Sequence, residues 1–209
     1  MTILIEAAVE SLEAALAAAE GGAHRLEFCA DLEHGGTTPD LKLLRFRLPI
    51  PVFVLIRPRA GDFVYSHAEH RTMLDQIRSA KAAGAQGIVT GDLDDDHTRT
   101  LIAAARPLPV TFHRAFDVFP DPSAALERLI SLGIERVLTS GGAATAAEGT
   151  EQIRALVAQA KGRVAILPGG GISAETVARL VRETGVREVH FSVKEAEKVR
   201  TVVQALSAL

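Results

Sequence analysis

A short apolar run, a polar residue, a loop and then an alanine- and leucine-rich segment recur eight times along this chain of 209 residues. The apolar runs cover residues 3–9, 25–29, 51–57, 87–90, 109–114, 136–140, 164–168 and 188–192. Strands that alternate with helical segments indicate parallel βαβ units, and eight such units close a (β/α)8 barrel. We therefore predict an α/β fold, a TIM-like barrel of eight parallel strands, whose functional groups lie at the carboxyl ends of the strands.

Capping residues bound the helical segments between these strands. Ser11 is expected to cap a helix over residues 12–20, and the glycine pair at 21–22 ends it. Further helices are predicted over residues 39–46, 67–83, 98–105, 121–132, 145–161, 173–184 and 194–208. No linker, low-complexity tract or change in composition divides the chain, so we predict one domain over residues 1–209.

Charge, cysteine content and hydropathy exclude several classes of protein. The formal net charge is -3 at pH 7, whereas a nucleic-acid-binding domain presents a basic face. A single cysteine rules out an internal disulfide, and residues 1–10 lack the basic start and apolar core of a signal peptide, so we expect a reducing, cytoplasmic setting. No apolar stretch approaches the ~20 residues that cross a bilayer. We therefore expect neither nucleic acid nor membrane as a partner.

Alternation along the strands predicts which side chains point into the barrel. In the second run Leu26 and Phe28 share one face, which suits the helix layer, so Glu27 and Cys29 point toward the barrel axis. The same parity brings a set of polar side chains to the upper barrel, namely Glu6, Glu27, Arg57, His113 and His190. Burying such charges is costly unless they are paired, so their concentration needs an explanation.

Two explanations remain open for this set of polar residues. In the first, Arg57 neutralises the carboxylates and the histidines are hydrogen-bonded core residues. In the second, which we favour, the residues surround a polar ligand, and a glutamate or histidine acts as general acid or base because burial moves its pKa toward neutrality. The second explanation requires a cavity above Glu27 and His113.

Loops after the last three strands predict an anion site beside these residues. The candidate anion-binding residues there are Ser140, Gly141, Gly169, Gly170, Gly171 and Ser192. In many barrels the loops after the seventh and eighth strands bind phosphate through backbone N–H groups and a helix N-terminus. The alternative is that the glycines serve tight turns or close helix packing.

The loop over residues 57–66 adds Arg59 as a further candidate for binding an anion. Together with Arg57 it could hold an anionic substrate through bidentate contacts. Equally, pairing between Arg59 and Asp62 would hold an ordered loop without any ligand. The carboxylates within residues 92–96 are interpreted as a solvated loop or helix start and receive little functional weight.

Several long motifs resemble a known family. Residues 21–30 (GGAHRLEFCA), 35–39 (GGTTP), 56–66 (IRPRAGDFVYS), 111–117 (TFHRAFD) and 138–141 (LTSG) are similar, in order, to the CutC copper homeostasis family. The resemblance implies a TIM-like barrel, a cytoplasmic protein, a homo-oligomer with a dimer as the expected form, and a link to copper handling. It carries over as matching positions Glu6, Glu27, Arg57, His113, Arg114, Ser140 and His190, and it adds Cys29 as the thiol implicated in binding Cu(I).

Copper is the cofactor that this resemblance implies, and Cys29 is the candidate metal ligand. Family members often carry a second cysteine on the first strand, where this chain has Ala7 and Ala8. Cu(I) prefers thiolate and thioether ligands, and the chain offers only Cys29, Met1 and Met73. A tight Cu(I) site within one subunit is therefore not expected.

Three classes of function remain open. The first is a copper-handling protein. The second is an isomerase, epimerase or lyase that acts on a small phosphorylated or carboxylated metabolite, with a divalent ion held by Glu6, Glu27 and His190 as a variant. Its catalytic candidates are Glu6, Glu27, Arg57, His113, Arg114 and His190. The third is a non-catalytic binding or scaffold protein, and the fold alone does not choose among these classes, because the barrel hosts many chemistries.

Overall fold

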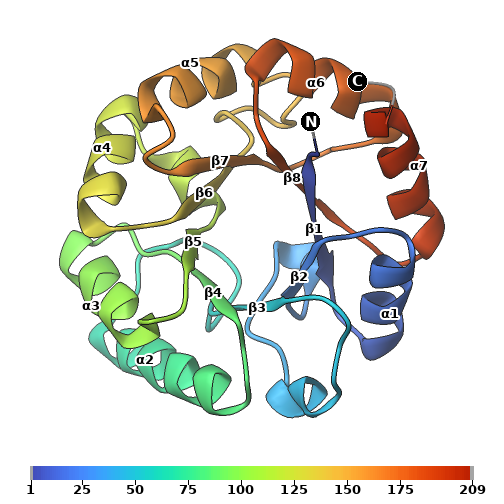
Figure 1. Cartoon of the computed structure of the whole chain (residues 1–209). Helices are drawn as coiled ribbons and strands as arrows, with labels where there is room; N and C mark the ends of the chain where they lie inside the picture. The colour runs from blue at the N-terminus through green and yellow to red at the C-terminus, as the bar shows by residue number, and fades with distance from the viewer. Residues whose placement is uncertain (1, 208–209) are drawn as a thin grey trace.

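The chain forms the predicted barrel, in which parallel strands make the inner wall and helices surround it (Figure 1). The computed structural model describes residues 2–207. Its strands are β1 (Leu4–Val9), β2 (Arg25–Phe28), β3 (Val52–Leu55), β4 (Gly87–Thr90), β5 (Val110–Phe112), β6 (Arg136–Thr139), β7 (Ala165–Pro168) and β8 (Glu188–Ser192). Its α-helices are α1 (Leu12–Glu20), α2 (His67–Ala82), α3 (Asp95–Ala105), α4 (Pro122–Leu132), α5 (Thr150–Ala160), α6 (Ala174–Thr184) and α7 (Ala196–Ser207), and its 3-10 helices are η1 (Leu32–His34), η2 (Leu41–Arg45) and η3 (Arg114–Val118). None of these helices, all within residues 2–207, has the length and apolar character needed to cross a membrane.

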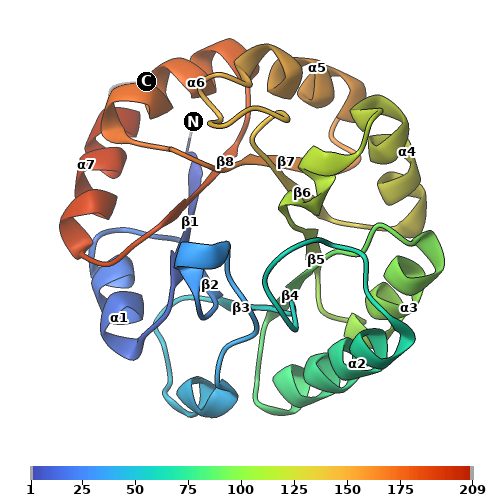
Figure 2. The same ribbon diagram turned by 180° about the vertical axis from the view of Figure 1, so that it is seen from behind.

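The strands follow one another around the barrel in chain order. Each strand from β1 to β6 pairs in parallel with the next, and β8 returns to pair with β1. Between β7 and β8, residues 2–207 contain a single bridge, which joins Gly169 to His190. A Cβ atom at position 169 would lie 3.2 Å from the His190 side chain across this seam and 2.6 Å from that of Leu138 on β6, so glycine allows the close approach. Because the strands are parallel, their carboxyl ends open on one face, and Figure 2 shows the loops after β2, β3 and β5 crossing that face.

Serine side chains cap the first turns of α1 and α2. The Ser11 hydroxyl accepts the N–H of Ala14 at 3.1 Å, which confirms the cap predicted for α1. Ser66 and Glu69 form a capping box at the start of α2. Each cap satisfies a backbone N–H that the first helical turn leaves free, a contribution of about 1 kcal/mol.

The second helix of the repeat differs from the prediction. Residues 39–46 contain the 3-10 helix η2 in place of an α-helix, with the N–H of Phe46 donating to Leu43 three residues back. Prolines at 49 and 51 follow closely and cannot donate the backbone hydrogen bonds of a longer helix. A short 3-10 segment therefore replaces the helix that the repeat predicts between β2 and β3.

The helices α5 and α7 begin later than predicted. The predicted start of α5 at residue 145 is wrong, because the N–H of Ala146 donates to the Gly170 carbonyl at 2.9 Å and holds residues 145–149 in a turn. This turn ties the loop after β6 to the loop after β7. The helix α7 starts two residues after position 194, and residue 208, its predicted end, lies outside the described residues.

Apolar side chains form two cores, one outside the strand barrel and one inside it. Leu26 and Phe28 belong to the larger core between strands and helices. The smaller core inside the barrel consists of Ala8, Cys29, Phe53, Leu55 and Val89. The inward direction predicted for Cys29 is therefore confirmed, and alternation along β2 explains it.

Ion pairs fill the amino-terminal half of the barrel, below the inner core. Arg25 contacts Glu6 through Nε and Glu188 through Nη2, the latter at 2.8 Å. Arg136 contacts the same carboxylate of Glu188 at 2.7 Å. The two guanidinium groups lie 4.8 and 5.5 Å from the centre of the Phe53 ring, within the range of cation–π attraction. These contacts compensate charges that are almost entirely removed from water.

Arg25, rather than Arg57, is the cation that neutralises Glu6. This corrects the explanation in which Arg57 pairs with the carboxylates. Arg25 precedes Glu27 by two residues and so shares its inward face, whereas Arg57 follows β3 at the opposite end of the barrel. Glu6 and the cavity-facing Arg57 are therefore at different levels of the barrel.

Replacing Arg25 removes the cationic partner of a fully buried carboxylate. We expect Arg25→Met to lower the free energy of unfolding by about 3–5 kcal/mol, the cost of breaking a buried ion pair from one side. Urea denaturation at pH 7 measures this. The control Arg78→Met, which removes an exposed pair with Asp75, should leave the urea midpoint nearly unchanged. Equal midpoints for Arg25→Met and the wild type would contradict the stabilising role of this pair.

Candidate functional site at the barrel mouth

A cavity of about 340 Å³ opens at the carboxyl ends of the strands. The predicted site residues that line it are Glu27, Arg57, His113, Arg114, Gly170, Gly171, His190 and Ser192. Glu6 is completely buried beneath them. The cavity required by the ligand hypothesis is therefore present at the predicted end of the barrel.

His190 lies between the two carboxylates of the upper barrel. Its Nδ1 is 2.8 Å from Oε1 of Glu6, and its Nε2 is 3.5 Å from Oε2 of Glu27. The strand register causes this arrangement, because Glu6 pairs with His190 on β8 and its inward neighbour Ala8 pairs with Glu27 on β2. Since the imidazole separates the carboxylates, the three groups do not converge on one point, and the geometry does not support a divalent ion held by them.

Burial and neighbouring charges give the two carboxyls opposite pKa shifts. Burial alone would raise the pKa of Glu6, but the hydrogen bond from His190 and the charge of Arg25 outweigh it and hold the pKa at about 2. Burial raises the pKa of Glu27 to about 7. The charge of His190 opposes this shift, and the charge of Glu6 adds to it. Burial opposes the charged form of His190, yet the hydrogen bond to Glu6 and the charge of Glu27 raise its pKa overall. Glu27 therefore gains and loses a proton near neutral pH, as a general acid or base must.

His113 contributes a hydrogen-bond donor to the cavity wall. Its Nδ1 accepts the N–H of Ala115 at 3.2 Å and so caps η3. Burial, together with the charge of Arg57, lowers the pKa of His113 to about 3, so the ring is neutral and the accepting Nδ1 leaves the proton on Nε2. This Nε2 is buried and has no hydrogen-bond partner within residues 2–207. Such a donor at a cavity wall calls for an acceptor from a bound molecule or water.

Packing fixes the orientation of the His113 ring. The Phe63 ring lies 5.0 Å away, centre to centre, and is tilted by 50°. On another side the backbone of Gly91 approaches so closely that a Cβ atom there would lie 2.8 Å from the imidazole. The loops after β3 and β4 therefore hold the imidazole in position.

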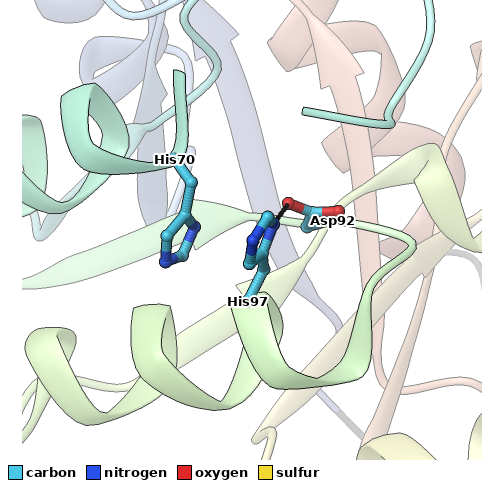
Figure 3. Close-up of side chains that lie close together, drawn as sticks. All are labelled: His70, Asp92 and His97. Carbon is cyan, nitrogen blue, oxygen red and sulfur yellow. Dashed lines mark hydrogen bonds and ion pairs between the residues drawn. The ribbon is translucent and has the colours of Figure 1, made fainter. Parts of the chain in front are cut away.

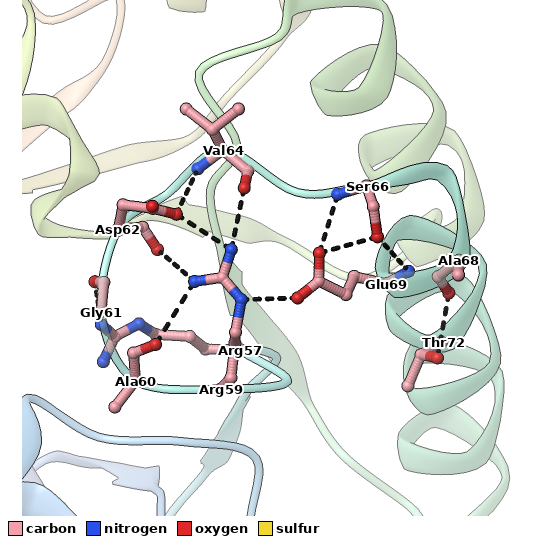
Figure 4. Close-up of polar contacts among 10 residues, drawn as sticks. All are labelled: Arg57, Arg59, Ala60, Gly61, Asp62, Val64, Ser66, Ala68, Glu69 and Thr72. Carbon is pink, nitrogen blue, oxygen red and sulfur yellow. Dashed lines mark hydrogen bonds and ion pairs between the residues drawn. The ribbon is translucent and has the colours of Figure 1, made fainter.

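Arg57 holds together the loops around the mouth. Its Nη1 donates to the carbonyls of Gly36 at 2.7 Å and His34 at 3.2 Å. Its Nη2 donates to the carbonyl of Gly61 at 2.8 Å (Figure 4). These carbonyls belong to the loops after β2 and β3. The Nε of Arg57 is buried and has no partner in the described part of the chain. Arg57 thus keeps one unused donor while it orders two loops.

Arg59 is occupied by its own loop and does not line the cavity. Its guanidinium contacts Glu69 at 2.5 Å, Asp62 at 2.9 Å and the carbonyl of Val64 at 2.9 Å (Figure 4). These contacts hold the loop after β3 against the start of α2. The anion-binding role predicted for Arg59 is therefore not supported, and the alternative of a loop ordered by pairing with Asp62 describes the structure.

A carboxylate of the chain itself occupies the loop after β6. Asp117 accepts the N–H of Ser140 at 3.1 Å, its hydroxyl at 3.0 Å and the N–H of Gly142 at 3.3 Å. The N–H of Gly141 donates to the Thr139 hydroxyl at 2.8 Å. The donors at Ser140 and Gly141 that were predicted to bind an external anion are therefore already used. Asp117 comes from η3, and nothing in the local sequence of the loop indicates this contact.

The loop after β7 keeps unused N–H groups at the cavity. Gly170 and Gly171 line it, and no hydrogen bond engages either backbone N–H among the residues from 2 to 207. Gly169 differs, because its N–H donates to the Thr139 carbonyl at 2.9 Å. The predicted anion loop is thus reduced to its second and third glycines.

Two cationic side chains stand beside this loop. A Cβ atom at Gly170 would lie 3.3 Å from Nη1 of Arg114, which places that guanidinium against the glycine backbone. Lys198 on α7 also lines the cavity, and its Nζ donates to the Ser192 carbonyl at 2.8 Å. Sequence reasoning missed Lys198 because it lies on a helix rather than after a strand. The two cations and the free N–H groups favour negative charge in the cavity.

Cys29 is part of the inner core rather than of the cavity lining. It is fully buried, with Sγ 3.5 Å from the Val9 carbonyl. Burial, reinforced by the charge of Glu27, raises the pKa of the thiol far above its ordinary value. Met73 is buried in the outer core, and Met1 lies outside the described residues. The thiolate that Cu(I) binding requires is therefore disfavoured at Cys29.

A second group of potential metal ligands lies between α2 and α3. His70, Asp92 and His97 each offer one ligand atom, and these atoms lie within 4.8 Å of one another (Figure 3). Asp92 is only 2% exposed, so the interpretation of residues 92–96 as a solvated loop is wrong for its first carboxylate. Asp94 does begin a helix, since it caps α3. The sequence did not indicate the group because its members come from two helices and a loop.

Comparison with known proteins gives one consistent result. The CutC family matches residues 3–195. The human copper homeostasis protein cutC homolog is 48% identical over 200 residues, covering 91% of this chain and 73% of the human protein. A family protein CutC of Xylella fastidiosa strain Temecula1 is 50% identical over 205 residues, covering 94% and 77%. The solved structure of CutC from Streptococcus agalactiae superposes with a TM-score of 0.86 at 34% identity, covering 91% of this chain and 98% of that one.

The pKa of Glu27 predicts how stability depends on pH. A carboxyl whose pKa is higher in the folded than in the unfolded protein stabilises the fold at low pH, and this contribution is lost as pH rises through about 7. Glutamine does not titrate, so we expect the difference in unfolding free energy between Glu27→Gln and the wild type to move in favour of the variant by about 2–3 kcal/mol from pH 5 to pH 8. Urea denaturation at both pH values measures it.

The control for this experiment is Glu13→Gln on the exposed side of α1. It should follow the pH dependence of the wild type. If Glu27→Gln does the same, the carboxyl does not titrate near neutrality and the acid–base role fails with it.

Proposed function

This chain belongs to the CutC family, and we therefore propose that it acts in copper homeostasis. We propose further that the cavity at the barrel mouth is its functional site and binds a small anionic molecule. The observation that carries this proposal is a pair of unpaired donors on two residues that line the cavity. Nε2 of His113 and Nε of Arg57 belong to residues that are 5% and 4% exposed, and neither atom has a partner within residues 2–207. Leaving a buried donor unpaired costs about 1–3 kcal/mol, which a bound acceptor would recover.

The chemistry of the cavity selects the class of ligand. Both unpaired atoms are donors, because neutral His113 carries its proton on Nε2 and arginine has no acceptor. Arg114 and the N–H groups of Gly170 and Gly171 add further donors on one wall. A volume of about 340 Å³ suits a small molecule. A phosphate or carboxylate group on a small metabolite satisfies these conditions.

Acid–base chemistry on the bound anion is a second candidate function. The observation that favours it is the contrast between Glu27, whose pKa is about 7, and His113, whose pKa of about 3 keeps it a neutral donor. A carboxyl that exchanges a proton beside a fixed donor suits isomerisation, epimerisation or carbon–carbon cleavage next to a carbonyl. His190 would return the proton to Glu27, since it contacts this residue and Glu6.

Copper itself does not fit the predicted ligand, Cys29. The thiol is buried in an apolar core, its protonated form is favoured, and the sequence contains no second cysteine. Cu(I) requires soft ligands that converge on the ion. Cys29 therefore does not act as a copper ligand in the proposed function, and copper homeostasis is the physiological setting of that function.

A metabolite screen read by thermal shift tests the proposed anion site. We expect at least one phosphorylated or carboxylated metabolite to raise the Tm by about 5–10 °C at about 100 times its Kd. The same compound should have little effect on His113→Asn and Arg114→Gln. Arg128→Gln, which removes an exposed arginine paired with Asp95 outside the mouth, is the matched control and should respond as the wild type does. Equal binding by wild type and His113→Asn would place the ligand elsewhere.

A copper titration tests the assignment of Cys29 separately. We expect Cys29→Ala to bind Cu(I) with the same affinity as the wild type, within a factor of about two, because a buried and protonated thiol is not a ligand. Competition with a chromophoric Cu(I) chelator under anaerobic conditions measures the affinity. A tenfold or larger loss in Cys29→Ala would restore the thiolate site that the family resemblance implies.

A further inference from the structure

We propose that His70, Asp92 and His97 form a binding site for a divalent cation of the zinc class, separate from the cavity at the barrel mouth. None of the three residues lines that cavity. His70 lies in the first turn of α2, Asp92 follows β4, and His97 lies in the first turn of α3. The packing of α2 beside α3 thus brings His70 to Asp92 and His97, which are five residues apart (Figure 3).

The ligand atoms are close enough for a small movement to complete a site. They lie within 4.8 Å of one another. A tetrahedral ion with ligands at about 2.0–2.2 Å separates them by about 3.4 Å, so a contraction of up to about 1.4 Å is required. The imidazole rings of His70 and His97 are stacked, with centres 4.0 Å apart and planes 11° from parallel. Binding would therefore turn at least one ring so that its lone pair meets the ion.

His70 offers an unused lone pair. The Thr100 hydroxyl donates to the His97 carbonyl at 2.9 Å and accepts from Nε2 of His70, also at 2.9 Å. The proton of His70 is then on Nε2, and Nδ1 is an acceptor that is buried without a partner among residues 2–207. An N–H held by a neighbouring oxygen is the arrangement that orients histidine ligands in metal sites.

Asp92 is a buried carboxylate held in place from both sides. Its Oδ1 accepts the N–H of Asp94 at 3.0 Å, and its Oδ2 lies 2.9 Å from Nδ1 of His97. The Thr98 hydroxyl also donates to its backbone carbonyl at 2.9 Å. A cation would take the place of the proton between Asp92 and His97. The His97 side chain is 16% exposed, so an ion can enter from that side.

The donor set selects the class of cation. Two imidazole nitrogens and one carboxylate oxygen suit zinc and neighbouring transition metals, whereas calcium and magnesium prefer oxygen ligands. Three protein ligands leave a fourth tetrahedral position for water. The absence of a thiol from the group separates this site from any Cu(I) site at Cys29.

Cobalt titration followed by zinc competition tests the proposal on the full chain after treatment with a chelator. We expect one Co²⁺ per chain, with the visible absorption of nitrogen and oxygen ligation, and displacement by one Zn²⁺. Removing a ligand should cost at least as much as the 10–100-fold loss that follows removal of an outer-shell partner. Asp92→Asn and His97→Gln should therefore weaken Zn²⁺ binding by at least tenfold.

Two controls make the result specific to this site. His34→Gln removes an exposed histidine that contacts Asp31 at 2.6 Å and resembles the pair of His97 and Asp92 without a third ligand. Glu27→Gln changes the barrel mouth. Both variants should bind Zn²⁺ as the wild type does. Circular dichroism establishes whether each variant is folded. If Asp92→Asn does not fold, the affinity of His97→Gln for Zn²⁺ tests the proposal alone.

Two results would overturn the assignment. The first is a wild type that takes up no stoichiometric Co²⁺ or Zn²⁺. The second is folded His97→Gln protein with unchanged affinity. If Glu27→Gln loses metal binding and His97→Gln retains it, the ion binds at the barrel mouth. That result would also contradict the proposal.

Discussion

Glu6 is the charge around which the barrel interior is arranged. It is completely buried on β1 and contacts the two neighbouring strands, with Arg25 on β2 and His190 on β8. A carboxylate in that position is tolerated only when a cation and hydrogen-bond donors compensate it. Arg25 belongs to the ion pairs of the lower barrel, whereas His190 faces Glu27 at the cavity. The same carboxylate therefore supports the stability of one end of the barrel and the proton-exchanging pair at the other.

The two ends of the barrel differ in how completely their polar groups are satisfied. Around Arg25 the charges alternate and contact one another. At the mouth, Asp117 accepts hydrogen bonds from the loop after β6, and Glu69 pairs with the Arg59 guanidinium. The donors of these two loops therefore need no ligand. His113 and Arg57 are left with buried donors that the described chain does not pair. Two of the four buried side-chain atoms without a partner in residues 2–207 thus belong to residues that line this cavity, and such atoms call for a ligand or water.

Much of the mouth could be predicted from the sequence, because strand parity has a period of two and parallel strands end on one face. Glu27, His113 and His190 follow from that rule alone. The rule does not reveal partners: Arg25 has the same parity as Glu27, but its pairing with Glu6 depends on the register between strands. Contacts between distant loops, such as that of Asp117 with Ser140, have no local signal. The group of His70, Asp92 and His97 was missed for the same reason, since helix packing rather than spacing assembles it.

Gly91 lies between the cavity at the barrel mouth and the group of His70, Asp92 and His97. It lies one residue before Asp92, and its backbone touches the His113 ring so closely that no side chain could be inserted without moving the ring. The neighbouring Leu93 donates its N–H to the carbonyl of Phe63, which packs on the same ring. Position 91 therefore acts as a spacer. Its missing side chain leaves the space that the imidazole occupies in the cavity wall, so any larger residue at position 91 would push His113 toward the cavity or out of its place.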